Sequence, residues 1–455
     1  MIKFFNTLTR KKENFRPIKK KAVQIYSCGP TVYDRQHIGN LRSAVIWDIL
    51  RRTLEFNGLK VRQVVNITDF GHLTSDADSG EDKMTKGLKK EGLALTLENM
   101  KKLGEKYAEF YLDDRKKLNT LSPFKFPFAS DHISEDIEFI KKLEKKGYVY
   151  ILDDGVYFET EKFPAYGKLG GLSEIQETRI GKNQKKKNPR DFVLWKMNEK
   201  IGWDSPWGKG FPGWHIECSV MSEKYLGKTF DIHTGGIEHI PIHHNNEIAQ
   251  SESVNGKKMA NFWMHNEHLI MPEGKMAKSL GNTITLTEIE EKGFDPLAFR
   301  YWLLGAHYRS PISFSWDALE ASQTAFEKIK NQIQEIKSKG KMSDRHLKKF
   351  KEAVNDDLNT PKALAILWEV LKDESLTPQD KKKTVLEMDK VFGLGLATLK
   401  KESITIPSEV KSLVEQREKA RREKNWGEAD RLRSEIEKKG FEIKDTNKGP
   451  VIKNC

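Results

Sequence analysis

The first 70 residues alternate between strand-like and helix-like hydrophobic patterns. The run AVQIYSC at 22–28 is β-rich, and a GPT turn follows it. Apolar residues then recur at helical spacing through HIGNLRSAVIWDILRRTLEFNG at 37–58, where the final glycine is a stop signal. The segment LKVRQVVNITD at 59–69 has the pattern of a second strand. This strand–helix–strand order predicts a parallel sheet in an α/β fold.

Polar residues stand where these predicted elements begin or end. Cys28 closes the first strand, His37 opens the helix, and Thr68 and Asp69 close the second strand. In parallel sheets, ligands bind beyond the carboxyl ends of the strands, and helix N-termini there attract phosphate. The pattern therefore indicates a ligand site at this edge of the sheet.

The later parts of the chain are more mixed. Residues 71–93 are polar and contain glycine, so we predict a loop there. Residues 115–212 combine short strands with a basic loop, as in an insertion, and a second α/β region with a helix opening near His243 follows. The pattern is helical from about residue 320. One charged helix is predicted over 409–439, before a short C-terminal hairpin.

Composition narrows the class of protein. The 455 residues carry a net charge of +13, with 37% hydrophobic and 32% charged residues. The length suggests about three domains. An excess of lysine and arginine suits a nucleic-acid partner, the alternative being lysine-rich solvated faces. No apolar run approaches the ~20 residues of a membrane span, and the basic start lacks the apolar segment of a signal peptide. We therefore expect a cytoplasmic protein without a membrane segment.

The three cysteines are too few for a disulfide framework. Cys455 is the terminal residue, which leaves Cys28 and Cys218, far apart in sequence. So few thiols favour a reducing compartment. Cys28 is open to interpretation as a buried filler, half of a disulfide, a nucleophile or a metal ligand. A lone cysteine such as Cys218 is most often a buried structural residue.

The segment IPIHHNNEIAQ offers further metal-ligating side chains. On a helix, His243 and Glu247 are four residues apart and share a face, whereas His244 faces elsewhere and is not expected to reach the same ion. The alternative is a surface hydrogen bond between the pair. Combined with Cys28 and Cys218, the donors are two sulfurs, a nitrogen and an oxygen, which suit zinc. Their spacing is not that of a zinc finger, so both interpretations stay open.

Two short motifs suit the phosphates of a nucleotide. HIGN at 37–40 starts a helix after a strand, and its glycine lets a flat ligand or a phosphate approach the backbone. KMAKS at 275–279 lies in a polar loop and offers two ammonium groups, which suit a triphosphate. Either motif alone is more often structural, but the two in this order favour a nucleotide site.

HIGN followed by KMAKS resembles the two signature motifs of the class I aminoacyl-tRNA synthetases. The surrounding sequence resembles the cysteinyl-tRNA synthetases in particular, through FNTLTRKKE, YSCGPTVYD, NITD, NPRDFVLWK, WDSPWGKGFPGWHIECS, HHNNEIAQSE, WMHNEHL and KMAKSLGN. DDLNTPKAL and REKARREKNWGEADRLRSEI extend the likeness toward the C-terminus. The resemblance covers nearly the whole chain.

The resemblance implies a class I Rossmann-type parallel-sheet catalytic domain with a connective insertion, followed by a helical tRNA- and anticodon-binding region and a small C-terminal α/β segment. The expected parts are 1–114 and 213–270 for the Rossmann catalytic domain, 115–212 for the connective insertion, 271–319 for the KMSKS-type loop and stem-contact region, 320–400 for the helical-bundle anticodon-binding domain, and 401–455 for the C-terminal helix and hairpin.

The implied activity is that of a cysteine–tRNA ligase. Cysteine and ATP would form cysteinyl-adenylate, and the terminal ribose hydroxyl of tRNA(Cys) would then take the acyl group. One zinc ion per chain and magnesium with ATP are the implied cofactors, and we expect a monomer. Two rival functions are a ligase that joins activated cysteine to an amino sugar and a non-catalytic RNA-binding paralogue. The long helical end argues against the first, and the retained motifs argue against the second.

The family's functional residues are carried over by position. The implied zinc ligands are Cys28, Cys218, His243 and Glu247. The implied ATP contacts are His37, Gly39, Asn40, Lys275 and Lys278, of which His37 and the two lysines are also implied to be catalytic. Thr68 and Trp214 are implied to line the amino-acid pocket. The lysines would stabilise charge that develops on the phosphates.

The sequence also departs from the family pattern. Ala277 stands where the family usually has serine. Gly71 and His72 stand where many members carry two acidic residues, and the segment around Thr234 and His239 differs too. Because of these departures, the resemblance does not specify the residues that surround the pocket. It still specifies the four metal ligands.

Overall fold

The computed structural model describes residues 1–71, 83–170, 185–271, 274–275, 283–334, 336, 339–399, 407–446 and 449–454. The chain divides into two compact units, Met1–Ala397 and Thr398–Cys455. None of the helices in the described ranges combines the length and the hydropathy needed to span a bilayer. The five predicted domain boundaries stay predictions.

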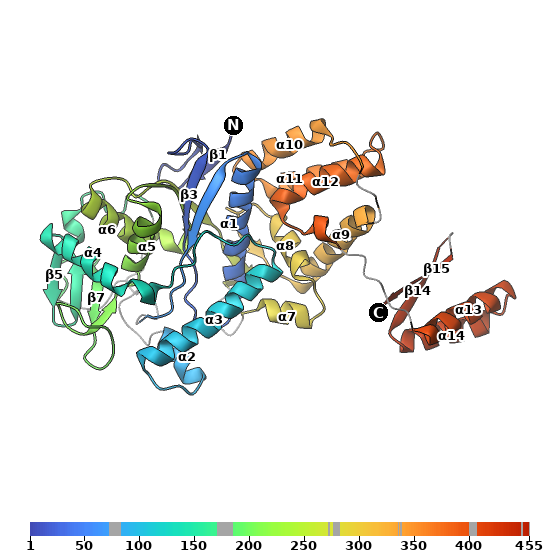
Figure 1. The fold of residues 1–455 in the computed structure, drawn as a ribbon, viewed down its shortest axis with the longest axis horizontal. Coiled ribbons are helices and arrows are strands. Elements are labelled where there is room, and N and C mark those ends of the chain that lie inside the picture. The colour runs from blue at the N-terminus through green and yellow to red at the C-terminus, as the bar shows by residue number, and fades with distance from the viewer. Residues whose placement is uncertain are drawn as a thin grey trace. The chain divides into compact units, whose positions relative to one another are not determined.

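A four-stranded parallel sheet, in the order β10–β9–β3–β4, lies at the centre of the first unit (Figure 1). Its strands are β3 (Ala22–Ser27), β4 (Lys60–Val65), β9 (Phe230–Gly236) and β10 (Ala260–Asn266). The helix α1 (Ile38–Phe56) connects β3 to β4, so the predicted strand–helix–strand order is confirmed. The carboxyl ends of β3, β4 and β9 therefore meet at one edge.

Apolar side chains cover both faces of this sheet. On the face of α1, Ile25 and Ile232 pack with Trp47 and Leu50 of the helix. On the other face, Tyr26 belongs to a cluster that includes Ile216 and Ile248, from α5 (Ile216–Leu226) and α6 (Asn245–Asn255). Burial on both faces is expected for a parallel sheet, whose strands are nearly continuous hydrophobic runs. It fixes α1, α5 and α6 beside the strand ends.

The chain between β4 and β9 forms helices and a second sheet. In the described residues the helices are α5, given above, and α2 (Lys83–Lys90), α3 (Leu97–Lys117), η1 (Ala129–His132), α4 (Ile133–Lys145) and η2 (Thr160–Lys162). The antiparallel sheet contains β5 (Val149–Leu152), β6 (Gly155–Phe158), β7 (Phe192–Met197) and β8 (Gly210–Pro212). The prediction of a loop over 71–93 is wrong for residues 83–90. Met84 and Leu88, four residues apart, are buried and hold α2 in place.

The remaining elements of the first unit follow or flank the central sheet. They are β1 (Lys3–Asn6), β2 (Lys11–Asn14), η5 (Ile237–His239), the π-helical η6 (Ile240–His244), β11 (Leu269–Met271), β12 (Gly274–Lys275), α7 (Leu286–Glu291), α8 (Pro296–Leu304), β13 (Ile312–Ser313), α9 (Trp316–Gln334), α10 (Asp344–Asn355), α11 (Thr360–Lys372) and α12 (Pro378–Phe392). The short helix η8 (Leu396–Thr398) spans the boundary between the two units. The run from α9 to α12 confirms the helical pattern predicted from about residue 320.

The second unit contains two helices and a hairpin. They are α13 (Ser408–Arg422), α14 (Trp426–Lys438), β14 (Phe441–Thr446) and β15 (Gly449–Asn454). The prediction of one helix over 409–439 is wrong. Lys424 has a left-handed φ of 59°, and the Asn425 side chain caps α14 by accepting a hydrogen bond from Glu428 N. This break lets Leu413 of α13 and Leu432 of α14 share one core.

Candidate functional site

One strand end and three helical segments bring the four predicted zinc ligands together. Cys28 follows β3, Cys218 lies in the first turn of α5, His243 lies in η6, and Glu247 lies in the first turn of α6. Their ligand atoms all lie within 4.8 Å of one another. Neither cysteine forms a disulfide. Cys28 is half-buried, and Cys218, His243 and Glu247 are buried. The spacing of His243 and Glu247 does place them together, since His243 Nε2 lies 3.0 Å from Glu247 Oε1.

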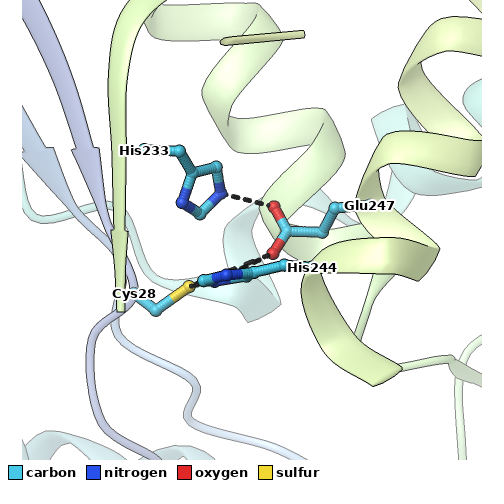
Figure 2. A group of neighbouring side chains, drawn as sticks. All are labelled: Cys28, His233, His244 and Glu247. Atoms are coloured by element: carbon cyan, nitrogen blue, oxygen red, sulfur yellow. Dashed lines mark hydrogen bonds and ion pairs between the residues drawn. The ribbon is translucent and has the colours of Figure 1, made fainter. Parts of the chain in front are cut away.

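A second group of donors shares two of these residues. His233 and His244 join Cys28 and Glu247 in a set whose ligand atoms also lie within 4.8 Å of one another (Figure 2). His244 Nε2 lies 3.4 Å from Cys28 Sγ and 3.8 Å from Glu247 Oε1. The expectation that His244 faces elsewhere is therefore wrong. His244 precedes Glu247 by three residues, which also places two side chains on one helical face.

Charged neighbours shift the pKa values of Glu247 and His243 in opposite directions. Burial alone would raise the pKa of the Glu247 carboxyl, but His233 and His243 outweigh it and hold that pKa at about 2. Burial would lower the pKa of His243, but Glu247 and then Cys218 raise it to about 10. His244 differs, because burial and the neighbouring histidines hold its pKa well below its ordinary value.

The two thiols have opposite pKa shifts. Burial and the hydrogen bond between the two thiols raise the pKa of Cys28 well above its ordinary value. The same hydrogen bond from Cys28 lowers the pKa of Cys218 to about 6, against its burial. A thiolate is the form that binds a metal ion. These shifts favour the anionic form at Cys218 and the protonated form at Cys28.

Three histidines that the sequence patterns did not single out surround the cluster. His233 Nε2 lies 2.8 Å from Glu247 Oε2. His215 Nδ1 lies 2.8 Å from His243 Nδ1, and His265 Nε2 lies 2.7 Å from His244 Nδ1. His233 and His265 lie on the central strands β9 and β10, and His215 immediately precedes α5. A polar ring on a buried strand is the signal that would have indicated His233 and His265.

The two residues predicted to line the amino-acid pocket border the same cluster. The Trp214 ring lies 4.3 Å from the His243 ring, centroid to centroid, and 4.8 Å from the His215 ring. Thr68 is buried, and its hydroxyl donates a hydrogen bond of 2.9 Å to Glu217 Oε2. Glu217 immediately precedes Cys218. Trp214 thus shields one side of the donors, and Thr68 is tied to the helix that carries one of the thiols.

The HIGN segment lies at the start of α1, beside the sheet edge. His37 occupies the N-cap position and pairs through its backbone with Thr285, the N-cap of α7. A Cβ atom added to Gly39 would lie 2.9 Å from His37 Nδ1, so only glycine leaves this ring its room. Asn40 Nδ2 donates to Gln36 Oε1. Lys275 lies on β12, and Lys278 lies outside the described residues.

The donor set can be compared with the preferences of a metal ion. Cys28, Cys218, His243 and Glu247 supply two sulfurs, one imidazole nitrogen and one carboxylate oxygen, all within 4.8 Å of one another. Zinc binds thiolate, imidazole and carboxylate, most often with four ligands, whereas magnesium and calcium bind oxygen. The residues therefore fit zinc. The second group has one sulfur and two imidazoles. It would bind zinc less strongly, because it offers one fewer of the soft sulfur donors that zinc accepts.

Family models match three parts of the chain. The model described as the tRNA synthetases class I (C) catalytic domain matches residues 14–324. The DALR domain matches residues 349–397, and the cysteinyl-tRNA ligase anticodon binding domain matches residues 405–450. The first match spans the parallel sheet, the insertion and the donor cluster.

Curated relatives match along the whole chain. Cysteine–tRNA ligase 1 of Burkholderia lata is 44% identical over 459 residues, which cover 98% of this chain and 96% of the relative. Cysteine–tRNA ligase of Treponema denticola is 41% identical over 486 residues, which cover 98% of each. Among solved structures, Mycobacterium tuberculosis methionyl-tRNA synthetase bound by methionyl-adenylate has a TM-score of 0.55 at 14% identity, over 83% of this chain and 91% of that one. The last match is a likeness of fold.

Proposed function

The chain belongs to the class I cysteine–tRNA ligases, and from this membership we propose that a zinc ion held by Cys28, Cys218, His243 and Glu247 selects the amino acid. The chain charges tRNA(Cys) with cysteine. The observation that carries the zinc proposal is the meeting of these four donor atoms within 4.8 Å of one another. Their carboxylate, imidazole and sulfur chemistry is that of a zinc site.

The size of the selection problem favours a metal. Serine differs from cysteine by oxygen in place of sulfur, and a pocket that senses only such small differences discriminates by ~10–200-fold. Accurate charging needs ~10⁴–10⁵-fold, or about 5.5–7 kcal/mol. A bound zinc ion would supply this difference, because it takes the thiolate of cysteine as a further ligand and prefers sulfur to a hydroxyl oxygen. Trp214 then closes one side of the pocket around the side chain.

The proposed reaction proceeds in two steps. The carboxylate of cysteine attacks the α-phosphate of ATP, which is bound with magnesium, to give cysteinyl-adenylate and pyrophosphate. The terminal ribose hydroxyl of tRNA(Cys) then attacks the carbonyl and releases AMP. His37, Gly39 and Asn40 bind the nucleotide, and Lys275 and Lys278 stabilise the charge that develops on the phosphates. The position of His37 at the start of α1, beside the strand ends, supports this role.

The tRNA partner would contact the C-terminal part of the chain, where the DALR and anticodon-binding models match. The net charge of +13 supports phosphate contacts, which make binding fall steeply as salt rises. We place this activity in the cytoplasm, with a single chain as the active form. Sedimentation of the purified protein at working concentration would test the single-chain state.

Cysteine-dependent exchange between ATP and pyrophosphate tests the activation step, with serine as the competing substrate. We expect exchange with cysteine and at least ~10⁴-fold less with serine. Equal exchange with the two amino acids would overturn the selection mechanism. Zinc analysis of Cys28→Ser tests the ligand assignment, with Cys455→Ser, which changes the third cysteine of the chain, as the matched control. Zinc retained in full by Cys28→Ser would refute the assignment.

A further inference from the structure

A buried chain of hydrogen bonds connects the residue that follows Cys28 to the residue that precedes Cys218. Gly29 N donates to Asn66 Oδ1 at 2.8 Å, and Asn66 Nδ2 donates to Thr68 Oγ1 at 3.3 Å. Thr68 Oγ1 in turn donates to Glu217 Oε2 at 2.9 Å. Gly29 directly follows Cys28, and Glu217 directly precedes Cys218. The relay formed by the side chains of Asn66, Thr68 and Glu217 therefore begins and ends one residue from a predicted zinc ligand.

The relay is shielded from water. Asn66, Thr68 and Glu217 are 2%, 8% and 1% exposed. Hydrogen bonds in such a dry environment are stronger than in water, and a member that loses its partner cannot replace it with solvent. Glu217 depends on Thr68 in particular, because its other oxygen, Oε1, has no hydrogen-bond partner in the described part of the chain.

The relay also has little room to shift. A Cβ atom added at Gly29 would lie 1.7 Å from the backbone oxygen of Asn66, so the turn after Cys28 lies directly against the end of β4. Two backbone hydrogen bonds hold the same two segments together: Val32 N donates to the Thr68 carbonyl, and Thr68 N donates to the Pro30 carbonyl. The turn after Cys28 is therefore held against the chain that follows β4, and Thr68 connects that chain to α5 through Glu217.

We propose that the relay of Asn66, Thr68 and Glu217 fixes the separation of the Cys28 and Cys218 sulfurs, and so sets the affinity for zinc and the preference for cysteine over serine. This inference rests on the proposed zinc site. The three side chains are positioning residues. The Thr68 hydroxyl donates to Glu217 and accepts from Asn66, so its proton is committed to the framework and is not offered to the amino acid.

The test compares Thr68→Val with Thr68→Ser in the full-length protein. Valine keeps the shape of threonine without the hydroxyl, whereas serine keeps the hydroxyl. Thr53→Val is the matched control, because Thr53 is also buried, lies on α1, and its hydroxyl has no hydrogen-bond partner in the described ranges. Zinc affinity is measured by competition with a chelating indicator, and cobalt(II) absorption reports thiolate ligation directly.

We expect Thr68→Val to bind zinc ~10-fold more weakly, within the range seen when a group supporting a metal ligand is removed. Its cobalt–thiolate absorption band should weaken, and its preference for cysteine over serine in pyrophosphate exchange should fall. Thr68→Ser and Thr53→Val should keep wild-type zinc affinity, cobalt spectrum and selectivity. The melting temperatures of Thr68→Val and Thr53→Val measure how much each substitution destabilises the fold. If both fall equally, a loss of zinc affinity in Thr68→Val alone is not caused by lower stability.

Unchanged zinc affinity and selectivity in a folded Thr68→Val would overturn the relay and leave the zinc proposal intact. Absence of zinc from the wild-type protein would instead overturn the proposed function. If Thr68→Val does not fold, Glu217→Leu and Glu217→Gln replace it. Glutamine keeps an oxygen that accepts from Thr68, and leucine does not, so only the leucine variant should lose zinc affinity. Equal affinities in this pair would also overturn the relay.

Discussion

His233 Nε2 lies 2.8 Å from Glu247 Oε2, and both side chains are fully inaccessible to solvent. The His233 ring is itself held against Trp263, with ring centroids 4.4 Å apart and planes at 13°. His233 therefore fixes the orientation of the carboxylate and turns its other oxygen, Oε1, toward His243 at 3.0 Å. Hydrogen bonds of this kind orient a carboxylate that binds a metal ion.

The two overlapping donor groups predict different losses of metal. Cys218→Ser should bind zinc at least ~10-fold more weakly, because a thiolate is a stronger zinc ligand than a hydroxyl. His244→Ala should keep close to one zinc per chain, because the group with two sulfurs does not include it. Zinc per chain after dialysis, by mass spectrometry, measures both variants. The reverse pattern would place the metal in the group of Cys28, His233, His244 and Glu247.

The sequence predicted structure best where a feature depends only on the spacing of residues along one helix. The run of apolar residues from 38 to 56 predicted α1, and the four-residue interval between His243 and Glu247 predicted their contact. Both rest on the helical repeat, which the fold does not alter. The meeting of Cys28 with Cys218 could not be derived in this way. It depends on the pairing of β3 with β9, which no local pattern specifies.

The sequence failed where tertiary packing or one unusual residue decides the local structure. His244 was expected to face away, but the fold brings Cys28 Sγ within 3.4 Å and Glu247 Oε1 within 3.8 Å of its Nε2 atom. The break after α13 depends on a left-handed φ at Lys424, which lysine rarely adopts. His233 contacts Glu247 because it ends up on the inner face of β9, and that requires the whole sheet.

The burial of Asp136 leads us to expect that an apolar residue at this position stabilises the fold. It lies on α4, fully buried, and neither of its carboxylate oxygens has a hydrogen-bond partner in the ranges that the structure describes. Asp136→Leu should stabilise the fold by about 1–3 kcal/mol at pH 7, since it removes the cost of burying an unpaired polar group. Urea unfolding measures the change. Glu138→Leu, on the same helix but exposed and paired with Lys141, is the control and should change little.

The gain from Asp136→Leu should also depend on pH. Burial raises the pKa of Asp136 well above its ordinary value of about 3.9. The folded state then holds a proton that the unfolded state releases, so wild-type stability falls as the pH rises from about 4 through the folded pKa. The advantage of the leucine variant should therefore be smaller at pH 4 than at pH 7. An equal advantage at both values would contradict a raised pKa.

Gly29→Ala should damage the turn that follows Cys28. Its Cβ would lie 1.7 Å from the Asn66 backbone oxygen, an overlap that only a backbone shift can relieve. We expect a loss of about 3 kcal/mol or more in the free energy of unfolding, at the upper end of overpacking effects, together with weaker zinc binding. Gly427→Ala is the control, because no heavy atom lies within 4 Å of its added Cβ, and it should be neutral or slightly stabilising. Equal stability of the two variants would contradict the close approach.

The carboxylate of Asp48 joins helices α1 and α8 through ion pairs that we expect to weaken in acid. Its Oδ2 accepts hydrogen bonds from Arg300 on α8 at 2.5 Å and from Arg52 on α1 at 2.7 Å, and Arg300 also donates to the Phe392 carbonyl at the end of α12. Asp48 and Arg300 are both almost fully buried. Asp48→Asn should therefore cost about 3–5 kcal/mol at pH 7, because it leaves a buried guanidinium without its counter-charge. Glu369→Gln, in the exposed pair with Lys349, should cost less than about 1 kcal/mol.

The cost of Asp48→Asn should shrink in acid. Burial alone would raise the pKa of Asp48, but Arg300 and Arg52 outweigh it and hold that pKa below its ordinary value of about 3.9. The stabilisation from the ionised carboxylate is thus present above about pH 4 and is lost as the pH falls through the folded pKa. Urea unfolding of wild type and Asp48→Asn at pH 7 and at pH 3 measures the difference. A gap that stays constant, or widens, on acidification would show that the carboxylate is not held in its ionised form by the two arginines.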